Sequence, residues 1–194
     1  IPRLLDSGHP CPPESAMFRP LLLAAALSAS AHAGAQELQP VPELDLERYA
    51  GVWHEIARLP NRFEEQCVAD ITATYTPLGD GKIRVVNACI NEDGKTEAVE
   101  GEARLAGGHP AKLEVRFAPK WLSFLPFVWG DYWVIALDED YRWAIVGEPD
   151  RKFLWFLTRE PSLDAETLEA LKARARGLGY ELDELEVITP PTDA

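Results

Sequence analysis

The chain has 194 residues, of which 46% are hydrophobic, enough for one hydrophobic core but too few for two. Its 32 acidic and 19 basic residues give a net charge of −13, which repels a phosphate backbone and leaves no basic stripe to bind one. Composition and charge therefore indicate a single soluble domain. They exclude nucleic acid as a partner and disfavour firm electrostatic attachment to an anionic membrane.

Residues 17–33 have the pattern of a secretory signal peptide. A start methionine and an arginine are followed by an apolar run at 21–27 and an Ala-x-Ala cleavage site at 31–33. The run is too short to span a bilayer, which disfavours the alternative of a transmembrane anchor. Residues 1–16 precede the start and are interpreted as an upstream artefact of the reading frame.

Gly34 occupies the position after the cleavage site at which a bacterial lipoprotein carries its acylated cysteine. We therefore expect an exported mature chain without a lipid anchor, located in the periplasm or outside the cell, with association with the outer membrane left open. Export places Cys67 and Cys89 in an oxidising compartment, where a pair of cysteines favours a bridge over a catalytic or metal site.

Between residues 51 and 159 the chain has the pattern of successive strands. Short runs rich in β-branched and aromatic residues are separated by turn residues, at roughly the 8 to 12 residue spacing of sandwiches and barrels. The predicted strands are 51–59, 68–76, 82–90, 97–106, 111–118, 131–137, 142–148 and 153–159. Eight antiparallel strands in simple succession indicate an all-β, up-and-down barrel.

The two cysteines lie on neighbouring predicted strands that a Gly-Asp-Gly turn joins. Side chains alternate with period two, so Cys67 shares a face with Ile71 and Tyr75, and Cys89 shares a face with Val85. Folding this hairpin brings both cysteines to the same end and face. We expect a disulfide between them, worth about 2–4 kcal/mol; two free buried thiols are the alternative.

After the eighth strand the period of the apolar residues changes. A helix-start signal at 161–164 precedes apolar residues that recur on one helical face up to Gly177. The apolar stripe of this lone helix has only the outside of a closed barrel to pack against. Residues 185–188 then predict a short final strand that returns to the sheet.

Three sequence blocks, in this order, resemble those of the lipocalins. They are Gly51-x-Trp53-His54-Glu55-Ile56-Ala57-Arg58, then Tyr132-Trp133-Val134-Ile135-Ala136-Leu137-Asp138 with Tyr141-Arg142, then Leu154-Trp155-Phe156-Leu157-Thr158-Arg159-Glu160-Pro161. With the barrel pattern and the following helix, the resemblance is closest to the bacterial, apolipoprotein D-like subgroup and covers about residues 44–190.

The resemblance implies an eight-stranded barrel that is closed at one end, open at the other, and flanked by one C-terminal helix. Such a barrel can hold one small lipophilic ligand, here expected to be a fatty acid or lysophospholipid that is stored or transported for membrane maintenance. No cofactor is expected. The expected organisation is 1–16 upstream artefact, 17–33 signal peptide, 34–43 spacer, 44–190 lipocalin domain and 191–194 tail.

The resemblance assigns Gly51, Trp53 and Arg159 to the barrel floor. Trp53 supplies a large apolar plug, and the guanidinium of Arg159 can lie over its ring in a cation–π contact worth about 0.5–2 kcal/mol. This pair is interpreted as structural rather than catalytic.

The candidate ligand-binding residues are those expected on the inward face of the barrel. They are Glu55, Ala57, Phe63, Ala73, Tyr75, Val85, Asn87, Tyr132 and Val134. An unpaired Glu55 anion inside an apolar barrel would be costly, so this carboxyl is expected to be protonated, to find a partner or to meet a ligand. Ala57, Ala73 and Ala136 would leave room for a chain-like ligand if they face inward; plain packing is the alternative.

An apolar loop at 121–129 joins the fifth and sixth predicted strands at the open end. Its large side chains include Trp121, Phe124, Phe127 and Trp129. One hypothesis is that this loop enters a membrane interface, where Trp and Phe are favoured. The alternatives are an inward-folded lid, a homodimer contact or a surface that binds a partner protein.

We find no sequence signal for catalysis. The chain lacks a Gly-rich phosphate loop and a nucleophile motif, and its downstream histidines, His54 and His109, lie on a strand and in a turn without metal-ligand spacing. Neighbouring strand residues point to opposite faces, so His54 does not form a couple with Glu55. The protein is therefore expected not to be an enzyme, with an isomerase-type cavity enzyme as the minor alternative.

Overall fold

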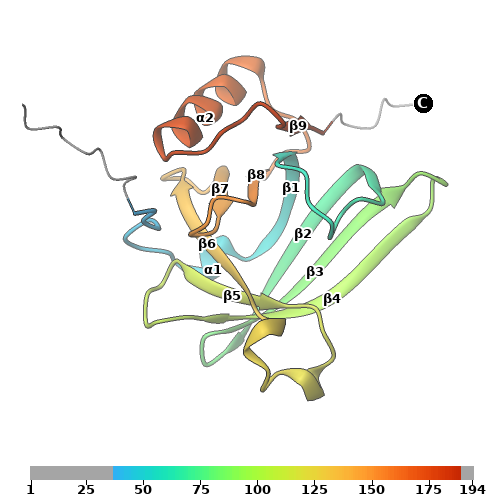
Figure 1. Cartoon of the computed structure of the whole chain (residues 1–194), viewed down its shortest axis with the longest axis vertical. Helices are drawn as coiled ribbons and strands as arrows, with labels where there is room; N and C mark the ends of the chain where they lie inside the picture. Colours follow the sequence, from blue (N-terminus) through green and yellow to red (C-terminus); the bar gives the residue numbers. More distant parts are fainter. Residues whose placement is uncertain (1–36, 189–194) are drawn as a thin grey trace, which may run out of the picture. The chain divides into compact units, whose positions relative to one another are not determined.

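The computed structural model describes residues 37–188, which form a closed antiparallel barrel with a helix outside it and one extra strand (Figure 1). The strands are β1 (Gly51–Arg58), β2 (Cys67–Gly79), β3 (Lys82–Asn91), β4 (Thr96–Leu105), β5 (Lys112–Arg116), β6 (Gly130–Leu137), β7 (Trp143–Gly147), β8 (Leu154–Thr158) and β9 (Glu186–Val187). The helices are α1 (Leu46–Tyr49) and α2 (Ala165–Gly177), with short 3-10 turns η1 (Lys120–Leu122) and η2 (Pro126–Val128). This architecture confirms the predicted fold, and the strand limits agree to within a few residues.

Strands β1 to β8 pair in chain order, and β1 pairs with both β8 and β2, which closes the barrel. Antiparallel order puts α1 and the turns after β2, β4 and β6 at one end, the floor. The connections after β1, β3, β5 and β7 lie at the other end, the mouth. Toward the mouth β1 leaves β2, and its last two residues pair with β9 instead.

The floor carries a short helix that the sequence pattern did not predict. Asp45 caps α1 by accepting hydrogen bonds from the backbone N–H groups of Glu47 and Arg48 at 2.9 and 3.3 Å. Four residues make little more than one turn, which is too short to display a helical period in the sequence. The helix places Tyr49 inside the barrel, next to Trp53.

Two apolar clusters account for most of the core of the described residues. The first fills the barrel interior and includes Trp53 and Val85. The second lies between the barrel wall and α2, where Leu171 and Ala175 of the helix are buried. Figure 1 shows α2 alongside the part of the barrel that contains β1, β7 and β8. The amphipathic helix therefore packs against the outside of the barrel, as its stripe predicted.

Two β-bulges, one in β1 and one in β6, change which residues face the barrel interior from those predicted. The pairing between β1 and β8 shifts between Glu55 and Ala57, and the pairing between β6 and β7 shifts between Val134 and Ala136. Each bulge adds one residue, so the alternation of faces restarts beyond it. The prediction that Ala57 and Ala136 can face the cavity is wrong, because both lie in the cluster against α2.

The hairpin of β2 and β3 carries the predicted disulfide between Cys67 and Cys89, whose Cα atoms are 5.6 Å apart. The bridge joins the mouth ends of the two strands, as the shared face predicted. The segments predicted as an upstream artefact (1–16), a signal peptide (17–33) and a tail (191–194) lie outside the described residues. Within the described chain, no helix is long and apolar enough to cross a membrane.

Candidate functional site

Arg159 and Trp53 meet at the barrel floor. The guanidinium carbon of Arg159 lies 3.9 Å from the centre of the Trp53 ring. Its nitrogens donate to the carbonyl oxygens of Val52 at 2.9 Å and Arg48 at 2.7 Å, while the Trp53 indole donates to the carbonyl of Tyr49 at 2.8 Å. The close approach also explains Gly51, because a Cβ there would lie 3.4 Å from Nη1 of Arg159 on a backbone with φ +94°. These contacts seal the floor.

Three tyrosines fill the barrel above Trp53. The hydroxyl of Tyr132 lies 2.8 Å from those of Tyr49 and Tyr75, and the ring centres of Tyr49 and Tyr75 are 5.4 Å apart. Burial raises the pKa of all three phenols, so they remain neutral hydrogen-bonding groups. The lower half of the barrel is thus packed with side chains, and ligand space has to lie nearer the mouth.

A buried ionic network lies above the tyrosines. Nη1 of Arg58 lies 3.3 Å from Oε1 of Glu55 and 3.9 Å from Oε2 of Glu64, and Nε of Arg58 donates to Glu186 at 3.0 Å. Glu55 thus has a protein partner. Its pKa is nevertheless raised, first by burial and then by the negative charge of Glu64, although Arg58 acts in the opposite direction.

Arg58 is one of the site residues that the sequence pattern did not predict. Regular alternation starting from an inward-facing Trp53 would place Arg58 on the outer face of β1. The bulge between Glu55 and Ala57 turns it inward instead, and Arg58 is only 5% exposed. The available signal was Ile56, an apolar residue at a position expected to face outward, followed by the apolar Ala57. A run of apolar residues where alternation is expected can mark such a bulge.

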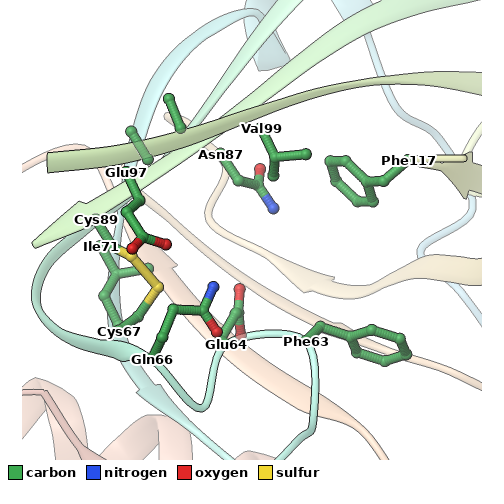
Figure 2. Close-up of a pocket in the computed structure, with 12 residues that line it drawn as sticks. Phe63, Glu64, Gln66, Cys67, Ile71, Asn87, Cys89, Glu97, Val99 and Phe117 are labelled. Carbon is green, nitrogen blue, oxygen red and sulfur yellow. A yellow bond between two sulfur atoms is a disulfide. The ribbon is translucent and has the colours of Figure 1, made fainter. Parts of the chain in front are cut away.

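An open cavity of about 280 Å³ lies at the mouth (Figure 2). It is bounded by the β1–β2 connection, the mouth ends of β2, β3 and β4, and the residue after β5. Its lining residues are Phe63, Glu64, Gln66, Cys67, Ile71, Asn87, Ala88, Cys89, Glu97, Ala98, Val99 and Phe117. The cavity is slightly smaller than the range of roughly 300–1,000 Å³ typical of drug-sized ligand sites.

The structure divides the predicted ligand-binding residues among several places. Phe63 and Asn87 line the cavity. The residues that belong to the apolar interior below it are Ala73, Tyr75, Val85, Tyr132 and Val134. Glu55 is in the ionic network, and Ala57 is outside the barrel. The sequence did not single out Glu64, Glu97 or Phe117, since two of them stand in or beside loops whose course period two does not determine.

The apolar loop at the mouth faces solvent. Trp121, Phe124 and Phe127 are 73%, 75% and 79% exposed. Trp129 instead anchors the loop, because its indole donates to the carbonyl of Ser123 at 2.9 Å and its ring lies 3.9 Å from the guanidinium carbon of Arg104. These exposures contradict the alternative of an inward-folded lid.

The fold and the cavity define a β-barrel of the class that binds small ligands in an open-ended interior. The chain belongs to the lipocalin-like family: the family model described as a lipocalin-like domain matches residues 44–190. The chain is 40% identical to temperature-induced lipocalin-1 of Arabidopsis thaliana over 81% of this chain and 85% of that protein. It is 40% identical to the outer membrane lipoprotein Blc of Citrobacter freundii, over 78% and 82%.

Further comparisons agree on the family and the fold. Apolipoprotein D of Mus musculus is 33% identical over 79% of this chain and 82% of that protein. Insecticyanin from the tobacco hornworm Manduca sexta superposes with a TM-score of 0.62 at 24% identity, covering 80% of this chain and 86% of that chain. At that identity the structural likeness shows the fold alone. The sequence-based assignment to the lipocalins is thus confirmed.

Proposed function

We propose that this protein binds one lipophilic molecule, of the fatty acid or lysophospholipid kind, at the mouth of its barrel and stores or carries it for membrane maintenance. The observation that carries the proposal is the cavity of about 280 Å³, open to solvent above a floor that Trp53 and Arg159 close. Apolar side chains such as Ile71 and Val99 supply surface against which a hydrocarbon chain can be removed from water.

The location we propose is the bacterial cell envelope, after export to the periplasm. Support comes from the signal-peptide pattern at 17–33, from the disulfide, which suits an oxidising compartment, and from the relatives named as outer membrane lipoproteins. Those relatives are named for a lipid modification, whereas Gly34 stands at the expected acylation position here. The proposed mature protein therefore reaches the same compartment without that anchor.

Native mass spectrometry of the protein exported to its own periplasm tests the proposal. We expect a bound lipid that solvent extraction releases and identifies. In Val99→Trp, a ring added to the cavity wall should displace this lipid, whereas Val86→Trp, on the outward face of neighbouring β3, serves as the matched control and should keep it. An empty wild-type barrel would contradict the proposal. An empty barrel with a tightly bound protein would favour the alternative in which the apolar loop at 121–129 binds a partner protein.

The exposed aromatic loop is proposed to contact the membrane from which the lipid is collected. Trp121, Phe124 and Phe127 lie at the mouth, beside the way into the cavity, and such side chains favour the bilayer interface. We expect the wild type to float with phosphatidylcholine vesicles and the variant with serine at all three positions to remain in solution. Leu78→Ser combined with Leu105→Ser, two exposed leucines at the floor, is the control that should still float.

Two outcomes would overturn the membrane contact. Unchanged flotation of the triple serine variant would show that the loop does not hold the vesicle. If the wild type is a dimer, the triple serine variant is a monomer and neither protein binds vesicles, the loop would be assigned to a homodimer contact.

A further inference from the structure

The guanidinium of Arg58, the cation beside the cavity, already contacts hydrogen-bond acceptors of the protein. Each of the three guanidinium nitrogens of Arg58 faces at least one: Nε faces Glu186 at 3.0 Å, Nη1 faces Glu55 at 3.3 Å, and Nη2 faces the carbonyl of Cys67 at 3.4 Å. Arg58 is buried and is not part of the cavity lining. The positive charge of Arg58 is therefore already shared with acceptors of the protein before a fatty acid carboxylate arrives.

The cavity lining itself carries negative charge. Glu64 and Glu97 are both lining residues, and the lining contains no lysine or arginine among residues 37–188. Figure 2 shows the carboxylates of Glu97 and Glu64 toward the end of the cavity that holds the disulfide. Arg62, the cation over the Phe63 ring at 5.3 Å, is exposed and so remains hydrated. A carboxylate entering this end would meet two charges of its own sign.

The two carboxylates are held in place by the protein. Oε1 of Glu97 accepts from the amide of Asn91 at 2.7 Å, and Oε2 of Glu64 accepts from Asn61 at 2.9 Å and from the indole of Trp155 at 3.0 Å. These donors are neutral, so they fill hydrogen-bonding positions of each carboxylate without neutralising its charge. The cationic contact of the pair is that of Glu64 with Arg58 at 3.9 Å. Burial is the main cause of the raised pKa of Glu55, and the nearby negative charge of Glu64 adds to it.

The opposite end of the cavity is apolar. Figure 2 shows the rings of Phe63 and Phe117 there, across from the carboxylates. Asn87, in the wall, has a buried Oδ1 without a hydrogen-bond partner in the described part of the chain. An amide can present either its oxygen or its nitrogen, so Asn87 offers a ligand one polar contact without setting the sign of its charge. The carboxylates alone set that sign.

We propose that the cavity selects a single-chain amphiphile whose polar end carries a cationic nitrogen, and discriminates against free fatty acids. The nitrogen lies between Glu64 and Glu97, and the hydrocarbon chain runs toward Phe63 and Phe117. This proposal rests on the proposed function, which it narrows from lipophiles in general to one kind of headgroup. Charge complementarity across a partly enclosed site gives such selectivity, and salt weakens it.

Matched twelve-carbon ligands test this selectivity: dodecyltrimethylammonium, dodecanoate and uncharged dodecanol, each titrated below its aggregation concentration and followed by tryptophan fluorescence. We expect the cation to bind at least about tenfold more tightly than dodecanoate at low salt, a ratio that shrinks as salt is added. Glu97→Gln should reduce the ratio severalfold, since the amide oxygen can keep the bond to Asn91 while the charge is lost.

Glu100→Gln is the control for the protein's overall negative charge. Glu100 stands on the same strand, faces outward and pairs with Arg84 at 2.8 Å, so its loss changes the net charge equally but should leave the ratio unchanged. Equal effects of the two substitutions, or dodecanoate binding as tightly as the cation, would overturn the headgroup proposal alone. Failure of all three ligands, dodecanol included, to bind would overturn the proposed function as well.

Discussion

The floor half and the mouth half of the barrel use similar residues for opposite purposes. At the floor, aromatic side chains are buried: the Trp53 ring contacts the guanidinium of Arg159, and the hydroxyl of Tyr132 contacts those of Tyr49 and Tyr75. At the mouth, rings such as Phe124 stand in solvent beside a cavity with carboxylates in its wall. The buried contacts at the floor stabilise the closed end of the barrel, whereas the proposed choice of ligand depends on residues at the mouth.

The largest expected effect on stability comes from removing the buried aromatic ring at the floor. Trp53→Ala removes a fully buried ring and should lower the free energy of unfolding by about 3–5 kcal/mol. Trp121→Ala, which removes the same ring from the solvent-facing loop, should change stability by less than about 0.5 kcal/mol. Urea denaturation compares the two variants. Similar losses at both positions would end the distinction between the halves.

The disulfide should give the next effect, at the mouth. Cys67→Ser combined with Cys89→Ser opens a loop of sequence separation 22 and should cost about 2–4 kcal/mol in urea denaturation. Reduction of the wild type by dithiothreitol should produce a shift of similar size. Because both cysteines line the cavity, the variant should also bind its ligand more weakly than the wild type. If stability and ligand binding were both unchanged, the disulfide would neither stabilise the fold nor shape the cavity.

A smaller effect, dependent on pH, is expected from Glu55. Its pKa in the folded state is raised above the ordinary value of 4.5, so above pH 4.5 the folded state retains a proton that the unfolded state has released. Stability therefore falls as pH rises from 4.5 through the raised pKa. Glu55→Gln cannot release that proton, and its stability should fall less over this window. Parallel pH profiles of the two proteins would contradict the raised pKa.

The smallest stability effect is expected in the apolar loop. Phe124→Ser should leave the free energy of unfolding, measured by urea denaturation, within about 0.5 kcal/mol of the wild-type value, because the side chain is 75% exposed. The same change should weaken vesicle flotation if the loop contacts the membrane as proposed. A large loss of stability would show instead that this ring packs against the protein in solution.

Strand order, barrel closure, the outer helix and the disulfide all follow from local patterns in the sequence. Period two predicts Cys67 and Cys89 on one face, and the prediction holds because β2 has two register shifts between Cys67 and Thr72, which together preserve the alternation. Period 3.6 marks the stripe of α2. The inward face of β1 could be predicted only as far as Glu55, because one extra residue at Ile56 restarts the alternation. A bulge is set by what packs on both sides of the strand, here the interior and α2, and that tertiary context is not visible within a short window.

The cavity was harder to predict than the fold for a similar reason. Tyr75, Val85 and Tyr132 were correctly expected on the inward face, but a face does not reveal how far side chains fill the space between strands. That depends on contacts across the barrel, such as those among the tyrosine hydroxyls. Glu64 comes from a connection outside the strands, where neither period applies. Strand patterning therefore does not select the part of the cavity boundary that lies outside the strands, which is formed by Phe63, Glu64, Gln66 and Phe117.

The extra residue at Ile56 makes the length of β1 adjustable. Removing it would leave Trp53 and Glu55 inside, Ala57 outside and Arg58 inside, the arrangement that a regular strand produces by itself. The edit would shorten the strand by one residue, about 3.3 Å, and draw the β1–β2 connection that carries Phe63 and Glu64 toward the floor. A shortening of the chain at this one point would thus resize the entrance of the barrel without turning any other side chain of the strand around.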